Sequence, residues 1–263
     1  REHLAERPPG RAGSWSVQRM SWEQQVVVYA GIARRTQNSP PQQNPFTPAP
    51  PPRCAAAADL SDRVGGVTGT IDPPPFRVRK PVIAAVNGHA VGIGLALALQ
   101  CDLRYLADDA VYGLSQVRRG VLADGYAHWT LPRLAGLANA ADILLTGRTF
   151  DGEEAKAMGL ANACLPGGEV LPTALAVAHD IANGSAPLTA ALSKRLLWES
   201  MDMAPSVVGR LETELNQHVA KSIDGGEAMT AFRERRQPEW SGSISEEWPA
   251  WDHPDEPERP SLH

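Results

Sequence analysis

The sequence is poor in three features that mark large classes of proteins. It has only three cysteines, Cys54, Cys101 and Cys164, too few and too widely spaced for a disulfide framework or a cysteine-based metal cluster. It has no apolar run of the roughly 18–20 residues that a membrane-spanning helix requires. It has no excess of positive charge, because 25 lysines and arginines face 30 aspartates and glutamates. These absences argue against a membrane-spanning protein, a disulfide-stabilised secreted domain and a general nucleic-acid binder.

Common metal and nucleotide motifs are missing as well. No His-x-His, HExxH or cysteine cluster indicates a metal site. The glycines that follow Asn87 suggest a dinucleotide fingerprint, but Leu97 occupies the third glycine position, so the GxGxxG pattern fails. Residues 1–7 lack the apolar core of a signal peptide. We therefore expect a protein without a metal or a nucleotide cofactor, and the three widely spaced cysteines fit a reducing cytoplasm.

The most informative stretch is residues 80–136. Its first part, residues 82–86, is a short apolar run typical of a buried strand, and Asn87-Gly88 ends it. Gly92 and Gly94 then lead into residues 95–99, which form helices readily. A glycine-flanked turn into a helix start offers free backbone N–H groups and the positive end of the helix dipole. This combination favours an anion, or an oxygen that becomes anionic during a reaction.

Strand and helix patterns alternate from residue 82 onward, which predicts an α/β fold with parallel strands. Further strands are expected at residues 26–29, 101–105 and 110–113. One helix should be capped by Asp151, with Glu154 three residues later, and should stop at Gly159. Other helices are expected over residues 139–145, 170–183, 206–222 and 227–236, and one opening at Pro187.

Several of these residues carry a resemblance to a known family. They are Lys80-Pro81 with the following AAVNG, Gly92 and Gly94, Cys101-Asp102, and the LTGR of residues 145–148. Over about residues 54–240 the sequence resembles the crotonase superfamily, the enoyl-CoA hydratase and isomerase family, and in particular its actinobacterial-like members. The resemblance implies a spiral of ββα turns with a helical C-terminal region that trimerises. It also implies an acyl-CoA thioester as substrate, no separate cofactor, and a homotrimer or a hexamer.

Four segments are expected along the chain. Residues 1–53 form a divergent N-terminal segment, whose residues 39–52 are a proline-rich loop. Residues 54–183 would be the crotonase core and residues 184–240 the C-terminal helical region. Residues 241–263 are rich in Trp, Pro, Asp and Glu without periodicity, and we expect a loose acidic tail there.

The resemblance implies two backbone N–H donors that stabilise an enolate oxygen, those of Ala56 and Ile93. Residues 54–60 resemble the family loop that carries the first donor, and an ordinary alanine-rich helix start is the alternative. Ile93 replaces a common glycine, which requires that its φ be helical. Ala58 and Gly92 would contact the substrate. Tyr126 and Trp129 could line an acyl pocket, with core packing as the alternative for both.

The acidic residues distinguish the possible reactions. Hydratases of the family hold a water molecule between two glutamates, and those positions here are Ala96 and Gln116, neither of which can act as a base. Gln116 can still hold a water or a substrate oxygen. Asp124 occupies a position that several family branches use for proton transfer, and a helix N-cap is the alternative. We therefore expect double-bond isomerisation with Asp124 as the base. The other hypotheses are a non-catalytic acyl-CoA-binding scaffold and a hydratase without the usual glutamates.

Seven other basic side chains have a functional and a structural interpretation each. His89 and His128 are expected to pack rather than to catalyse. Arg118 and Arg119 could orient Asp124 or face solvent. A basic cluster of Arg77, Arg79 and Lys80 could meet the phosphates of CoA or form a solvated face.

Overall fold

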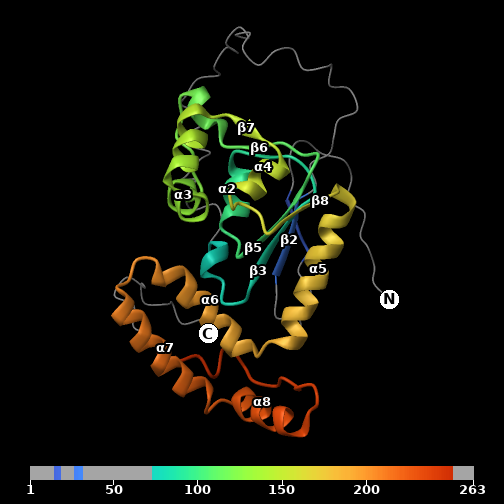
Figure 1. Ribbon diagram of the computed structural model, residues 1–263, viewed down its shortest axis with the longest axis vertical. Coiled ribbons are helices and arrows are strands. Elements are labelled where there is room, and N and C mark those ends of the chain that lie inside the picture. Colours follow the sequence, from blue (N-terminus) through green and yellow to red (C-terminus); the bar gives the residue numbers. More distant parts are fainter. Residues whose placement is uncertain (1–14, 19–26, 32–72, 251–263) are drawn as a thin grey trace, which may run out of the picture. The chain divides into compact units, whose positions relative to one another are not determined.

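The computed structural model describes residues 15–18, 27–31 and 73–250, which belong to two compact units. The sheet unit contains the described residues up to Ala178 except residues 79–81. The C-terminal unit contains residues 79–81 together with residues 179–250. Figure 1 shows the elements of both units along the chain.

Within the described residues, the main sheet has five strands in the order β1-β2-β3-β5-β8. Figure 1 labels β2, β3, β5 and β8. The strands of this sheet are β1 (Trp15–Gln18), β2 (Val27–Gly31), β3 (Val82–Val86), β5 (Leu103–Ala107) and β8 (Ala163–Leu165). The last four are parallel, and β1 pairs antiparallel with β2 at the edge. Every residue of β3 is buried, as expected for a strand between two parallel neighbours. The predicted α/β fold with parallel strands is confirmed.

Strand β5 begins two residues later than the pattern predicted. Cys101 and Asp102 form a bend instead, and the Asp102 carboxylate accepts a hydrogen bond from the Val82 N–H at 2.6 Å. A short polar side chain that binds a neighbouring backbone N–H favours a turn over a continuing strand. The bond also fixes the start of β3 beside the start of β5, where Ile83 pairs with Leu103.

A second sheet, of three described strands, places the start of the helix at Ile93 beside the end of the strand at Gly113. Its order is β4-β6-β7, with bounds Ala90–Val91, Tyr112–Gly113 and Thr149–Phe150. The Ala90 N–H donates to the Val111 carbonyl at 3.0 Å, and the Gly92 N–H donates to the Gly113 carbonyl at 2.8 Å. The residues that follow β4 and β6 are therefore held side by side.

The helices of the sheet unit mostly follow the sequence pattern. They are η2 (Pro75–Arg77), α2 (Ile93–Leu99), η3 (Ser115–Arg119), α3 (Ala127–Thr146), α4 (Gly152–Ala157) and α5 (Gly167–Gly184), whose last turns extend into the C-terminal unit. Asp151 caps α4 as predicted, because its carboxylate accepts the Glu154 N–H at 2.8 Å. Gly159, at a φ of 82°, follows the end of that helix. None of the described helices is both long and apolar enough to cross a membrane.

The described part of the C-terminal unit contains three further helices, α6 (Pro187–Ser200), α7 (Pro205–Val219) and α8 (Ile223–Glu234). Helix α6 opens at Pro187 as expected. Helix α8 begins before the predicted Glu227, because Ser222 caps it by accepting the Gly225 N–H at 3.0 Å. Residues 79–81 belong to this unit, and the Lys194 ammonium donates to the Lys80 carbonyl at 2.9 Å.

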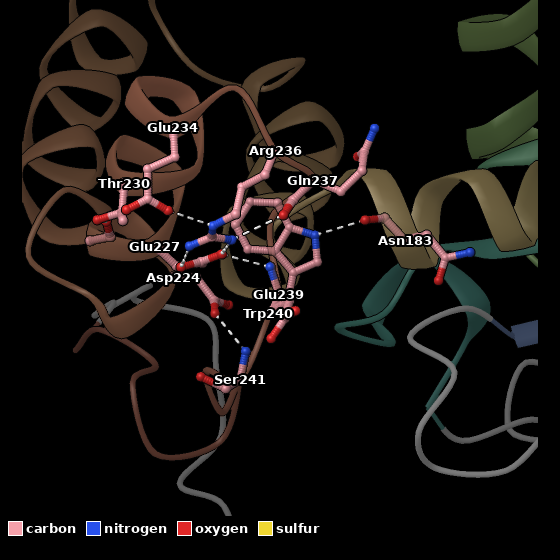
Figure 2. A network of polar contacts seen from close by, with 11 residues as sticks. Asn183, Asp224, Glu227, Thr230, Glu234, Arg236, Gln237, Glu239, Trp240 and Ser241 are labelled. Atoms are coloured by element: carbon pink, nitrogen blue, oxygen red, sulfur yellow. Dashed lines mark hydrogen bonds and ion pairs between the residues drawn. The ribbon is translucent and has the colours of Figure 1, made fainter.

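The expectation of a loose tail is wrong for residues 241–250. Figure 2 shows the polar contacts that hold the start of this segment. The Ser241 and Gly242 N–H groups donate to one Asp224 oxygen at 3.0 and 2.8 Å, and the Trp240 indole N–H donates to the Asn183 carbonyl at 3.0 Å. Further along, the Arg79 guanidinium lies 4.3 Å from the ring centroid of Trp248. Backbone N–H groups and indole rings therefore anchor the segment. Its composition, rich in acids and prolines, gives no sign of these contacts.

Candidate functional site

The candidate site begins at the N-terminal end of α2. Gly92 precedes the helix with φ 66° and ψ −128°, a conformation that is open to glycine and strained for other residues. Ile93 is the first helical residue and is not among the described residues of positive φ. The condition for an isoleucine at this position is therefore met, because the unusual dihedrals fall on Gly92. The N–H of a first helical residue has no partner within its own helix and is available to a ligand.

Gln116 and Asp124 lie beside this helix end. Gln116 belongs to η3, which directly follows β6, and its amide Nε2 donates to Asp124 Oδ1 at 3.4 Å. A methyl group built on Gly92 would lie 3.5 Å from the same Nε2. Three segments therefore converge: the turn at Gly92, the 3₁₀ helix η3 and the loop that carries Asp124. The other amide atom, Gln116 Oε1, is buried and accepts no hydrogen bond from the part of the chain that the structure describes.

Asp124 does not cap α3. The N-cap is Tyr126, and it makes no side-chain capping bond to that helix start. Asp124 contributes its backbone carbonyl, which accepts the Ala127 N–H at 3.2 Å. Its half-buried carboxylate instead meets Gln116. The cap alternative for Asp124 is therefore wrong, because its side chain contacts Gln116 rather than the start of α3.

The turn from Asp124 to Tyr126 packs closely on α2. Gly125 and Tyr126 both adopt left-handed backbone, with φ of 61° and 62°. This conformation costs a non-glycine residue about 1–2 kcal/mol. A methyl group on Gly125 would lie 2.8 Å from Ile93 Cδ1 and 3.1 Å from Ala96 Cβ. The turn thus lies against Ala96, and a longer side chain at that position would meet it.

Tyr126, Trp129 and Phe76 form an aromatic cluster next to this turn. The rings of Phe76 and Tyr126 meet edge to face with centroids 5.2 Å apart, and those of Phe76 and Trp129 are 5.0 Å apart. The Arg133 guanidinium lies 4.4 Å from the Trp129 ring centroid. The aromatic side chains therefore pack on one another, and a contact between Tyr126 or Trp129 and an acyl group stays a prediction.

One polar residue near the site gave no signal in the sequence. Gln100 is only 2% exposed, and its amide Nε2 donates to the Gly125 carbonyl at 2.8 Å and to the Ala96 carbonyl at 3.3 Å. A glutamine at a helix end is ordinarily a surface residue. Only the contact with Gly125, 25 residues further along the chain, indicates a special role.

The remaining predicted residues fall into two groups. Ala56 and Ala58 lie outside the described residues, as does the whole loop at residues 54–60. Of the others, His89 accepts the Val111 N–H at 2.8 Å, which is a structural contact, and the His128 side chain is exposed. The Arg118 guanidinium donates to the Thr146 carbonyl at 2.7 Å, so it binds the end of α3 rather than Asp124.

Two shifted pKa values in the sheet unit belong to buried side chains of β6 and β5. Burial raises the pKa of the Tyr112 phenol, whose hydroxyl donates to the Ala107 carbonyl at 3.0 Å. Burial lowers the pKa of the Arg104 guanidinium, which donates to the carbonyls of Leu160 and Cys101. Both side chains serve the packing of the main sheet. The described residues include no group of three side chains suited to a metal ion.

Comparison with known proteins gives a consistent result. The sequence profile of the enoyl-CoA hydratase/isomerase family matches residues 76–243. An enoyl-CoA hydratase of Alternaria alternata is 34% identical over 170 residues, and an (E)-benzylidenesuccinyl-CoA hydratase of Thauera aromatica is 36% identical over 195 residues. These matches cover 64% and 74% of this chain, and 57% and 73% of the respective relatives.

A solved structure agrees. The crystal structure of a probable enoyl-CoA hydratase/isomerase from Mycobacterium abscessus matches with a TM-score of 0.72 at 39% sequence identity. The match covers 88% of this chain and 100% of that one.

Proposed function

The chain belongs to the enoyl-CoA hydratase/isomerase family, and from this membership we propose that it binds an acyl-CoA thioester and stabilises the enolate of that thioester. Loss of a proton from the carbon beside the thioester carbonyl, or from the γ carbon of an enoyl group, places negative charge on the carbonyl oxygen. The Ile93 N–H would receive this charge, because it lies at a helix start without an intrahelical partner. The Ala56 N–H would be the second donor, and each such donor contributes about 2.7–4 kcal/mol to the transition state.

Asp124 would be the base. The observation that supports this role is its contact with Gln116 at 3.4 Å beside Gly92, together with the absence of a capping bond from its side chain to the described start of α3. Gln116 is a neutral partner that orients a carboxylate without competing for its proton. A carboxylate that takes a proton from one carbon can return it to another carbon of the same conjugated system. Double-bond isomerisation therefore needs no second acid.

Hydration by two carboxylates has less support at these residues. Ala96 is fully buried and lies against the Gly125 turn, and Gln116 cannot act as a base. Because two relatives are named as hydratases, hydration stays a candidate reaction for the chain. A scaffold that binds acyl-CoA without chemistry is the other candidate.

One experiment distinguishes the three functions. The chain is incubated with a β,γ-enoyl-CoA in deuterated water, and both double-bond migration and deuterium incorporation are followed. We expect both in the wild type, and we expect Asp124→Asn to lower both rates by about 10²–10⁴-fold, the contribution typical of a positioned base. Asp151→Asn is the matched control, since asparagine also caps helices well and Asp151 only caps α4.

The alternatives predict different results. Acyl-CoA binding without exchange in the wild type would indicate a scaffold. Turnover of crotonyl-CoA to the 3-hydroxy product well above the uncatalysed rate would indicate a hydratase.

We further propose that the chain functions in the cytoplasm as a homotrimer or a dimer of trimers, as its resemblance to the family implies. Sedimentation equilibrium at several concentrations tests the assembly, and a monomer at all of them would contradict it.

A further inference from the structure

Gln100 connects the two halves of the candidate site. It follows directly after α2, the helix that begins at Ile93, and its side chain is 2% exposed. Its amide Nε2 reaches the Gly125 carbonyl at 2.8 Å, in the turn that carries Asp124. The proposed oxyanion donor and the proposed base lie on these two elements, so this hydrogen bond couples their positions.

The hydrogen bonds of the turn show why this one differs from the rest. The Asp124 carbonyl accepts the Ala127 N–H at 3.2 Å, and the Tyr126 carbonyl accepts the Trp129 and Thr130 N–H groups at 2.9 Å. Those bonds come from the first turn of α3, which the turn itself leads into. Within the part of the chain that the structure describes, the bond from Gln100 to the Gly125 carbonyl is the hydrogen bond that ties this turn to the end of α2.

The chemical nature of residue 100 points in the same direction. The other amide atom, Gln100 Oε1, is buried and has no hydrogen-bond partner among the residues that the structure describes. An unpaired buried acceptor destabilises the folded state, and an apolar side chain of the same length would avoid that cost. The advantage of glutamine over an apolar residue at this position is therefore the hydrogen bond that its Nε2 donates to Gly125.

We propose that Gln100 is a positioning residue, which sets the location of the Asp124 carboxylate relative to the Ile93 N–H by holding the Gly125 carbonyl. Close packing assists it, because Gly125 has no room for a side chain against Ile93 and Ala96. A displacement of a reacting group by about 1 Å can lower a rate by about 10²-fold. This proposal rests on the function proposed above.

The first test replaces Gln100 with methionine, which keeps the length and removes the donor. We expect kcat for deuterium exchange into the acyl-CoA to fall by about 10–100-fold, while KM stays within about threefold. Asn139→Leu is the matched control, because Asn139 is also an amide that donates to a carbonyl, that of Ala135 at 2.9 Å within α3. It should change kcat by less than about twofold. Thermal unfolding of both variants verifies that they are folded at the assay temperature.

The second test replaces Gln100 with glutamate and compares its exchange rate with the wild type from pH 8 to pH 5. A protonated glutamic acid can donate to the Gly125 carbonyl, whereas a carboxylate cannot. The ratio of the two rates should therefore rise as the pH falls, while the ratio for Gln100→Met stays flat. This variant also decides the question if the methionine variant does not fold.

The outcomes separate this proposal from the one on which it rests. Exchange in the wild type with an unchanged kcat in Gln100→Met, or a flat ratio for Gln100→Glu, would overturn the positioning role and leave the proposed function standing. Acyl-CoA binding without any exchange in the wild type would overturn both.

Discussion

Two aspartates in different units of the molecule show how a carboxylate can be committed to structure or left free. Asp224 in the C-terminal unit is 1% exposed, and one of its oxygens accepts the Ser241 and Gly242 N–H groups at 3.0 and 2.8 Å (Figure 2). Asp124 in the sheet unit is half-buried, and its carboxylate accepts a 3.4 Å hydrogen bond from the Gln116 amide. The Asp224 carboxylate thus serves as the hydrogen-bond acceptor for two backbone N–H groups, as structural acids commonly do. The Asp124 carboxylate has hydrogen-bonding capacity left for a substrate.

The surroundings of the two residues differ in the same way. Asp224 belongs to a polar network in which Arg236 pairs with Glu227 and Glu234, and the Glu239 N–H donates to Glu227 at 2.7 Å (Figure 2). Asp124 is surrounded by special backbone geometry, with positive φ at Gly92, Gly120, Gly125 and Tyr126. Tyr126 is the only non-glycine among these four, and Arg235 in the C-terminal unit also has a positive φ, so what distinguishes the surroundings of Asp124 is its glycine-rich turns rather than strain. The four predictions below test this difference, from the largest expected effect to the smallest.

Gly125→Ala should have the largest effect. The new methyl group would lie 2.8 Å from Ile93 Cδ1 and 3.1 Å from Ala96 Cβ, and φ is 61° at this position, so the Ile93 side chain or the turn must shift. We expect exchange to fall by at least about 10²-fold and stability by about 1–2 kcal/mol. Gly168→Ala is the control, because a methyl group there meets no described atom within 4 Å. Exchange rates and urea unfolding test both variants, and unaltered exchange in Gly125→Ala would remove the turn from the site.

Asp224→Ala should act on stability rather than on chemistry. It leaves the Ser241 and Gly242 N–H groups without their acceptor, which costs about 2–4 kcal/mol. Asp224→Asn keeps an acceptor oxygen and should stay within about 1 kcal/mol of the wild type. Urea unfolding measures the difference, and kcat per folded molecule should change less than about threefold in both. A large loss of kcat at full folding would contradict the structural assignment.

Gln116→Glu should change the pH dependence of exchange. It places a second carboxylate beside Asp124, where Gln116 now donates at 3.4 Å, and like charges disfavour ionisation of both. We expect the pH at half-maximal exchange to rise by about one unit. Crotonyl-CoA hydration should not appear, because Ala96 still supplies no second carboxylate. A pH–rate profile tests the first point, and hydratase activity in this variant would favour the hydratase hypothesis.

Glu227→Gln should have the smallest effect, and only in acid. The Arg236 guanidinium and then the Glu239 N–H lower the pKa of the Glu227 carboxylate to about 2. Because the folded-state pKa is lowered, its stabilising contribution is present above the ordinary value near 4.5 and is lost as the pH falls towards 2. The unfolding midpoints of the wild type and Glu227→Gln should therefore differ slightly at pH 6 and converge near pH 2. The difference at pH 6 should be smaller in high salt. A constant difference over this range would disprove the assignment.

Features that depend on nearby residues could be predicted from the sequence. The cap at Asp151 needs only Glu154 three residues later, and the stop at Gly159 needs only a glycine in left-handed backbone. The buried run at β3 predicted a strand between parallel neighbours, which the pairing with β2 and β5 confirms. The family resemblance covers about residues 54–240, and the profile match to residues 76–243 confirms the family.

Features that depend on distant residues could not be predicted in this way. The partner of Gln100 lies 25 residues away at Gly125, and a backbone carbonyl leaves no trace in the sequence. Asp124 precedes a helix and so has the pattern of a cap, but the left-handed Tyr126 takes that position. Residues 241–250 are held by Asp224 and by indole rings, so their order depends on tertiary contacts rather than on composition.

The pairing of β2 with β3 has a consequence for how the chain folds. Val27 pairs with Val82, whereas Ile83 pairs with Leu103 much closer in sequence. Closing a longer loop costs more entropy, but each doubling of its length adds only about 0.6 kcal/mol. We therefore expect β3 and β5 to associate early and β2 to join them late. Halving the connection between β2 and β3 should then change folding speed more noticeably than equilibrium stability.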